Sequence, residues 1–338
     1  MEAILYQTGS KNVIQCALCA HRCVVKEGKR GICGVRENQQ GRLISLVYGK
    51  LIAQHVDPIE KKPLFHFLPG SRSYSIATAG CNFKCRFCQN AEIAHLPLSY
   101  PGSVMAGEDV SAEDVVRKAL LSECLTIAYT YTEPTVFLEF ALDVMKIAKA
   151  NGIRNVFVTN GYMTEEALNA VLPFLDAANV DLKAFRAEFY QSICRAKLDP
   201  VKETLWRMHE KGIWLEVTTL LIPGLNDGSD EIYELADFIA NRIGVDVPWH
   251  ISRFHPDYQM LDRPITSVES LKTARDIGLS SGLRYVYIGN VTGEYGENTF
   301  CWACSKLLIE RKGFQLLQNR VVDGRCPDCG QAIDGIFH

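Results

Sequence analysis

Three features typical of nucleic-acid or membrane proteins are missing from this 338-residue chain. Lys and Arg form no run and the formal net charge is −3, so no basic surface for nucleic acid is expected. The longest apolar stretch, 126–150, contains Glu133, Glu139, Asp143 and Lys146, and therefore predicts no bilayer-spanning helix. The first ten residues lack the basic and apolar segments of a secretory signal. We expect a soluble, cytoplasmic protein without a membrane or nucleic-acid partner.

Internal repeats and low-complexity segments are also absent. Hydrophobic residues make up 47% of the chain, which is enough for a sizeable core and argues against a disordered or fibrous protein. At about 150 residues per domain, the length predicts one large domain with one or two small ones.

Cysteine is the residue present in excess, with 13 copies. Disulfides are rare in a reducing cytosol, so clustered cysteines indicate metal or redox chemistry. The cysteines form three tight groups, and Cys124 and Cys194 stand alone. The groups are Cys16, Cys19, Cys23 and Cys33; Cys81, Cys85 and Cys88; and Cys301, Cys304, Cys326 and Cys329.

Short apolar runs alternate with amphipathic helical patterns over residues 73–292. This alternation predicts βαβ units and a parallel sheet. We expect an α/β fold, a partial (β/α) barrel of about six parallel strands, with an open doubly wound sheet as the alternative. Residues 1–72 and 293–338 are expected to form small Cys-rich metal-binding domains. Seven strands are expected, at 75–78, 126–129, 155–159, 178–181, 214–221, 249–252 and 285–288.

The expected helices lie between these strands. Ser111 precedes Glu113 and Asp114, which predicts a helix N-cap at that serine. The helical stretches lie near 111–123, 135–150, 164–172, 186–194, 200–211, 229–243 and 267–281.

The central cysteine group directly follows the first strand of the expected barrel. Its spacing is Cys-x3-Cys-x2-Cys, with Phe87 before the third cysteine and no fourth cysteine nearby. Active sites of β/α barrels lie on the loops after the strands. Three thiolates at this position fit a [4Fe–4S] cluster with one open iron, and the alternative is a zinc site completed by a distant residue.

The two outer groups are complete quartets. The C-terminal quartet consists of two Cys-x2-Cys pairs, and Gly330 follows Cys329 in a knuckle pattern. It predicts a zinc ribbon or a rubredoxin-like iron site, and we favour zinc as a structural staple. The N-terminal quartet, Cys16 to Cys33, predicts either structural zinc, which we favour slightly, or an auxiliary iron–sulfur cluster.

The central motif resembles that of the radical S-adenosylmethionine (SAM) superfamily. The segments YTYTEP, VTNGY, VDLK, EVTTLLIPGLND and WHISRFHPDY at successive strand ends resemble the branch of pyruvate formate-lyase activating enzyme. With CALCAHRCVVKEGKRGICGVREN, DPIEKKPLFHFLPGS and the C-terminal cysteine pairs, the whole chain resembles the radical SAM enzymes of the AmmeMemoRadiSam system.

This resemblance implies a specific chemistry. The open iron of the [4Fe–4S] cluster would chelate SAM, and one electron would cleave it to methionine and a 5′-deoxyadenosyl radical that abstracts a hydrogen atom. The resemblance implies a one-electron donor such as flavodoxin or ferredoxin. It also suggests Memo-like and AMMECR-like proteins as partners.

The resemblance also assigns cofactor residues at the strand ends. Glu133 would receive the SAM amino group, although a carboxylate is also favourable at a helix N-terminus. Thr159 and Asn160 would approach the ribose or the methionyl group. Asp181 and Lys183 end the fourth strand, and Lys183 would pair with the SAM carboxylate or form a rim salt bridge. Phe87 completes the cofactor set.

Three further features have a functional and a structural interpretation. His255 loosely matches a histidine near SAM in the activating enzyme, with His250 as the alternative. Cys194 is a hydrogen-donor candidate or a core residue. The segment 57–63 is a rigid linker or a substrate entrance, where Lys61 or Lys62 would bind an anion.

Two other functions compete with a radical SAM enzyme acting on an unknown small molecule or protein. The first is an activase that makes a glycyl radical on a partner. The second is a non-catalytic zinc-binding interaction protein, which would leave the three-cysteine site unexplained.

Overall fold

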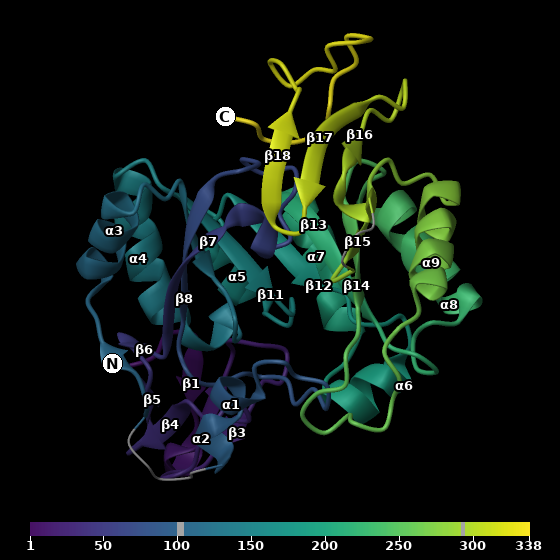
Figure 1. Ribbon diagram of the computed structural model, residues 1–338. Coiled ribbons are helices and arrows are strands. Elements are labelled where there is room, and N and C mark those ends of the chain that lie inside the picture. The colour runs from purple at the N-terminus through teal and green to yellow at the C-terminus, as the bar shows by residue number, and fades with distance from the viewer. Residues whose placement is uncertain (100–104, 292–294) are drawn as a thin grey trace.

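The computed structural model describes residues 1–99, 105–291 and 295–338. A central sheet has the strand order β15-β14-β13-β12-β11-β10-β8-β7 (Figure 1). Strands β8 and β10 to β15 run parallel, and β7 pairs antiparallel to β8 at one edge. The strands are β7 (Ala53–Pro58), β8 (Arg72–Ala77), β10 (Thr126–Tyr129), β11 (Arg154–Thr159), β12 (Ala177–Asp181), β13 (Trp214–Leu221), β14 (Trp249–Arg253) and β15 (Val286–Gly289).

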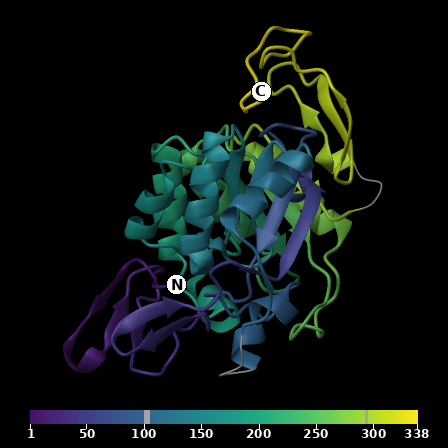
Figure 2. The same ribbon diagram turned by 90° about the vertical axis from the view of Figure 1, so that its left-hand side faces the viewer.

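Helices cover the outer face of this curved sheet (Figures 1 and 2). Ser111 caps α3 by accepting a hydrogen bond from the Asp114 backbone N–H at 3.1 Å, as predicted. The helices are α3 (Ala112–Leu121), α4 (Leu138–Ala150), α5 (Glu165–Val171), α6 (Ala187–Phe189), α7 (Asp199–Glu210), α8 (Ser229–Phe238) and α9 (Val268–Ser280). Short 3-10 or π turns extend several of them, at Pro134–Phe137, Tyr190–Cys194 and Ile239–Ile243.

The alternation of seven parallel strands with helices confirms the predicted α/β fold with a partial barrel. Each predicted strand is present to within a few residues. Buried parallel strands are nearly continuous apolar runs, so their positions can be predicted from the sequence. None of the helices in the described residues is long and apolar enough to cross a bilayer.

Two small regions lie at opposite ends of the barrel (Figures 1 and 2). The N-terminal region lies beside two short helices, α1 (Ala91–Ala94) and α2 (Leu96–Ser99), that follow the central cysteine loop. Its strands are β1 (Tyr6–Thr8), β2 (Ile14–Cys16), β3 (Val24–Val25), β4 (Arg36–Gln39), β5 (Arg42–Ser45) and β6 (Lys50–Leu51), and β6 pairs with β9 (Glu108–Asp109).

The C-terminal region is a three-stranded antiparallel sheet of β16 (Thr299–Phe300), β17 (Leu307–Lys312) and β18 (Gln315–Asn319). It contacts the segment 59–70, which packs into the barrel through Ile59, Leu64 and Phe67. The expected domain boundary at 292/293 lies outside the described residues.

Candidate active site

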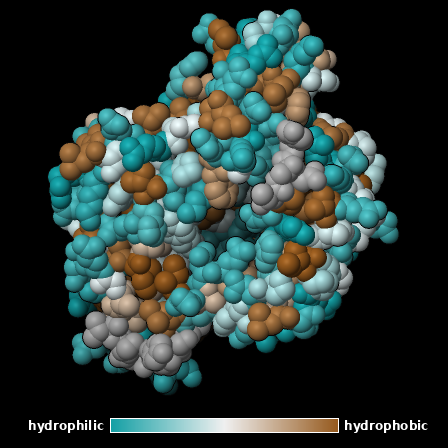
Figure 3. Space-filling model, in the orientation of Figure 1, coloured by the Kyte–Doolittle hydropathy of each residue, from teal (hydrophilic) through white to brown (hydrophobic). Residues whose placement is uncertain are grey.

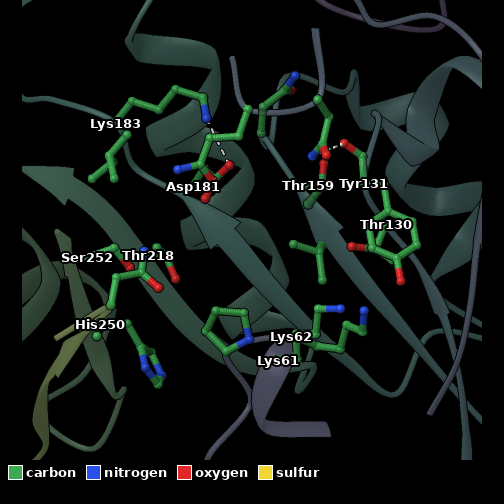
Figure 4. A pocket seen from close by; sticks show the side chains of 18 of the residues that line it. Lys61, Lys62, Thr130, Tyr131, Thr159, Asp181, Lys183, Thr218, His250 and Ser252 are labelled. Atoms are coloured by element: carbon green, nitrogen blue, oxygen red, sulfur yellow. Dashed lines mark hydrogen bonds and ion pairs between the residues drawn. The ribbon is translucent and has the colours of Figure 1, made fainter. Parts of the chain in front are cut away.

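A cavity of about 550 Å³ opens at the carboxyl ends of the parallel strands. The space-filling view shows it as a hollow near the middle of the molecule (Figure 3). Asp181 and Lys183 lie on one side of it and Tyr131 and Thr159 on another (Figure 4). The predicted site residues Cys81, Cys85, Cys88, Phe87, Glu133, Thr159, Asn160, Asp181 and Lys183 all line this cavity.

The three central cysteines lie on the loop that follows β8. Gly80 has φ +102°, and a Cβ there would meet the Val35 Cγ1 at 2.5 Å, so only glycine fits where this loop meets the N-terminal region. The thiols form no disulfide. Within the described residues they are not a group whose sulfurs all lie within 4.8 Å of one another. The sulfurs of the C-terminal quartet, by contrast, do meet this limit.

Asn82 supplies polar groups beside Cys81. It is fully buried, and its Oδ1 accepts a hydrogen bond from the Asn160 Nδ2 at 2.7 Å. Its own Nδ2 has no hydrogen-bond partner among the described residues. A buried donor without a partner is costly unless something fills the space beside it. The Asn82 amide therefore keeps one unused donor in the residue next to Cys81.

Glu133 joins the ends of two neighbouring strands. Its Oε1 accepts from the Thr159 hydroxyl at 2.7 Å and its Oε2 from the Asn160 backbone N–H at 2.8 Å. The Thr135 backbone N–H and hydroxyl also donate to Oε1. Burial raises the pKa of the Glu133 carboxyl, while these donors favour its ionised form. Glu133 therefore holds Thr159 and Asn160 in place at the cavity wall, and Oε2 has capacity for a further donor.

Lys183 is a partly buried cation at the other side of the cavity. Its Nζ lies 2.8 Å from the Asp181 Oδ2 and 5.7 Å from the centre of the Phe87 ring. Burial alone would lower the pKa of Lys183, but Asp181 and the nearby Cys85 and Cys194 raise it well above its usual value. Lys183 therefore offers a permanent positive charge close to the cysteine loop.

The segment 57–63 carries a compact ion cluster, and its residues 60–63 line the cavity. The Asp57 Oδ2 binds the Lys62 Nζ at 2.7 Å, and its Oδ1 binds the Lys61 Nζ at 2.9 Å. The Tyr131 hydroxyl also donates to Asp57. Burial alone would raise the pKa of Asp57, but these three donors hold it well below its usual range. Burial lowers the pKa of Lys62 to about 8. Both lysines are thus already paired with an acid.

A buried acid, Glu216 on β13, was not singled out from the sequence. Its Oε2 lies 2.6 Å from the Nε2 of His250, which lines the cavity. The backbone N–H groups of Phe65 and His66 donate to the same carboxylate at 2.9 and 2.8 Å. The sequence signal was a Glu inside an otherwise apolar strand. Glu216 thus anchors the 59–70 segment and orients His250.

Two predicted residues lie away from the cavity. His255 is exposed on the loop after β14 and does not line the cavity, whereas His250 does. Cys194 is fully buried behind the cysteine loop, where its carbonyl accepts from the Lys84 N–H at 2.9 Å. A hydrogen bond with Cys194, together with burial, raises the pKa of the Cys85 thiol.

Residues 75–239, which contain this cysteine loop and the carboxyl ends of five parallel strands, match the model of the radical SAM superfamily. The chain belongs to the radical SAM superfamily.

Several relatives of this radical SAM protein are known. It is 44% identical over 335 residues to the uncharacterized protein MJ0808 of Methanocaldococcus jannaschii, covering 98% of each chain. It is 22% identical over 210 residues to the pyruvate formate-lyase-activating enzyme of Clostridium pasteurianum, covering 57% of this chain and 84% of that one. A radical SAM methyltransferase from Sphaerobacter thermophilus has the same fold, with a TM-score of 0.51, 18% identity and 71% of each chain covered.

Membership of the radical SAM superfamily implies a [4Fe–4S] cluster and SAM as cofactors. The residues present fit both. Three unbridged thiols with wide spacing face the cavity, and the Asn82 amide is an unused buried donor beside them. A cavity of about 550 Å³ is of the size that holds a cofactor.

The C-terminal quartet of this radical SAM protein forms a separate candidate metal site. The sulfurs of Cys301, Cys304, Cys326 and Cys329 all lie within 4.8 Å of one another. The Cys301–Cys329 and Cys304–Cys326 sulfur pairs are each 3.7 Å apart. Zn–S bonds of about 2.3 Å in a tetrahedron place the sulfurs about 3.8 Å apart. The geometry fits one tetrahedral ion.

Proposed function

We propose that this protein is the radical SAM enzyme of an AmmeMemoRadiSam system, acting by hydrogen abstraction on a small molecule or a partner protein. The observation that carries the proposal is the open three-cysteine loop on the wall of a cavity lined by strand-end polar residues. In this proposal residues 73–292 form the catalytic core, and 1–72 and 293–338 are metal-binding domains.

The chain's own residues would bind and orient the cofactors. Cys81, Cys85 and Cys88 would hold the cluster, and Asn82 would donate a hydrogen bond to it. Glu133 would accept the ammonium of SAM on Oε2 while it keeps Thr159 and Asn160 in place.

Lys183 would face the carboxylate of SAM from its pair with Asp181. Phe87 would pack beside the loop. When bound, a reduced cluster supplies one electron to the sulfonium of SAM, which yields methionine and a 5′-deoxyadenosyl radical.

The substrate would enter between the segment 57–63 and the strand ends. Lys61, Lys62 and Tyr131 line that part of the cavity. They surround Asp57, so two ammonium groups face one carboxylate and this wall keeps one excess positive charge, which would favour an anionic group of the substrate. Flavodoxin or ferredoxin would supply the electron, and Memo-like and AMMECR-like proteins would be partners.

The decisive assay is anaerobic SAM cleavage. Reconstituted protein with dithionite and SAM should form 5′-deoxyadenosine. The Cys85→Ser variant should form none, because the cluster loses one of its three ligands. Cys124→Ala removes a buried cysteine outside all three groups and should match the wild type. No 5′-deoxyadenosine from fully reconstituted wild-type protein would refute the proposal.

Glycyl-radical activation is the second candidate, because the sequence is similar to the pyruvate formate-lyase-activating enzyme of Clostridium pasteurianum. The two candidates predict different products. An activase would leave a stable glycyl radical on an added glycyl-radical enzyme, visible by electron paramagnetic resonance. We expect no such signal with a pyruvate formate-lyase, while 5′-deoxyadenosine still forms.

A further inference from the structure

The N-terminal quartet is built differently from the C-terminal one. Cys16, Cys19, Cys23 and Cys33 line a single cavity and form no disulfide. Three of them are buried, and Cys23 is half-buried. Among the described residues, no three of these sulfurs lie within 4.8 Å of one another. Four thiols therefore face one space, and their spacing is wider than that of the C-terminal quartet.

A glycine and several apolar side chains make up much of the wall of this cavity. A Cβ on Gly31 would lie 3.7 Å from the Cys23 sulfur and 3.9 Å from the Cys33 sulfur, so Gly31 lies beside both. Leu18, Val25 and Leu43 fill the remaining wall. The quartet belongs to the main hydrophobic core of the protein, so its spacing is held by packing on several sides.

Arg36 supplies an unused donor at the same cavity. The residue is 1% exposed and lines the same cavity as the thiols. One of its terminal nitrogens binds the Glu139 Oε1 at 2.6 Å and the Ile4 carbonyl at 3.0 Å. Its Nε has no hydrogen-bond partner among the described residues. A buried N–H of this kind is satisfied by an acceptor inside the cavity, such as an inorganic sulfide or a thiolate.

A multi-iron cluster accounts for these observations together. In a [4Fe–4S] cluster each thiolate binds a different iron, so the four sulfurs stand farther apart than they do around a single zinc. The inorganic sulfides accept N–H hydrogen bonds from the surrounding protein. We propose that Cys16, Cys19, Cys23 and Cys33 hold a second [4Fe–4S] cluster, with one cysteine on each iron and no open position.

This second site lies directly against the central cysteine loop. A Cβ on Gly80 would come within 3.2 Å of the Cys33 carbonyl oxygen. The Lys84 ammonium donates to the Cys81 carbonyl at 2.7 Å and lies within electrostatic range of Cys33. The His21 Nε2 lies 2.9 Å from the Asn82 carbonyl oxygen. The two sites therefore share a wall, and the proposal stands whether or not the central site cleaves SAM.

Metal counting on the full chain tests the proposal. The protein is purified without oxygen and reconstituted with iron and sulfide in the presence of zinc. The wild type should hold about eight irons, about eight sulfides and about one zinc. The triple variant Cys81→Ser/Cys85→Ser/Cys88→Ser should keep about four irons and, after reduction, show the electron paramagnetic resonance signal of a [4Fe–4S] cluster. An iron-free triple variant with about two zincs would overturn the proposal.

A measurement on the unmodified protein guards against misfolding of the variant. Native mass spectrometry distinguishes two [4Fe–4S] clusters with one zinc from one cluster with two zincs. The first composition supports the proposal, and the second overturns it. The Cys124→Ala variant is the matched control and should give the wild-type composition. SAM cleavage is a separate readout, so failure of the proposed function would leave the iron count of the triple variant unaffected.

Discussion

The two cysteine quartets have the same four ligands but different surroundings. The C-terminal sulfurs lie within 4.8 Å of one another on two short knuckles, next to a small hydrophobic cluster that includes Tyr285 and Leu308. The N-terminal sulfurs are farther apart and belong to the main core beside the central loop. Cysteine number alone therefore does not set the metal, because the packing around the loops fixes the distance between the sulfurs.

The largest difference between the quartets should appear when the C-terminal one is broken. Cys326→Ser should release the zinc that we propose for this quartet and unfold residues 299–319, because structural zinc supplies about 10–16 kcal/mol in small domains. The iron content should not change, since that quartet lies at the opposite end of the barrel (Figure 2). Zinc analysis and limited proteolysis measure the two effects. If residues 299–319 resist proteolysis after the zinc is lost, the small hydrophobic cluster alone would be sufficient to keep this region folded.

The N-terminal quartet is tied to the core by a buried ion pair, Arg36–Glu139, with side chains 2% and 3% exposed. Arg36→Met leaves the Glu139 carboxylate buried and unpaired, which should cost about 3–5 kcal/mol of unfolding free energy. Urea unfolding measures the loss. The double variant Arg36→Met/Glu139→Leu should recover most of it, since no charge is then left unpaired. A double variant as unstable as Arg36→Met would contradict this explanation.

The opposite end carries a pH-sensitive contact at His66. Its Nδ1 lies 2.6 Å from the Asp334 carbonyl oxygen and its Nε2 2.5 Å from the Tyr287 hydroxyl. Burial lowers the pKa of His66 to about 4. Because the unfolded chain binds this proton near its ordinary pKa of about 6.5, stability is full above that pH and falls as the pH drops toward 4.

When the pH is lowered from about 7 to about 5, the titration of His66 should therefore reduce the free energy of unfolding by about 2 kcal/mol. Chemical denaturation at several pH values measures the slope. His66→Gln keeps a donor and an acceptor but does not titrate, so its stability should change less over this window. Burial alone would raise the pKa of Glu216, but His250 lowers it below its ordinary value. Glu216 therefore changes the pH dependence of stability only below the ordinary carboxyl range, outside this window. If the unfolding free energy of His66→Gln depends on pH as strongly as that of the wild type, His66 is not the group responsible.

Much of the fold could be predicted from the sequence, but less of the site. The strands after residue 72 are apolar runs and the cysteine loop has a distinctive spacing, so both can be predicted from short stretches of the sequence. The pairing of Glu133 with Thr159 and Asn160 joins two strand ends, and the bond of Glu216 to His250 depends on strand register. Such contacts join residues far apart in sequence, which a local pattern does not encode.

The smallest expected effect is at an exposed ion pair on the N-terminal side. Arg22 lies 2.9 Å from Glu166 at the start of α5, and both side chains are 45% exposed. Arg22→Ala should cost only about 0.2–1 kcal/mol, and less at high salt, because water screens exposed charges. A double-mutant cycle with Glu166→Ala isolates the pair from the effect of Glu166 on the helix N-terminus. A coupling energy above about 2 kcal/mol would exceed the range for exposed pairs. Surface charge would then contribute, beside the buried Arg36–Glu139 pair, to holding the N-terminal quartet against the barrel.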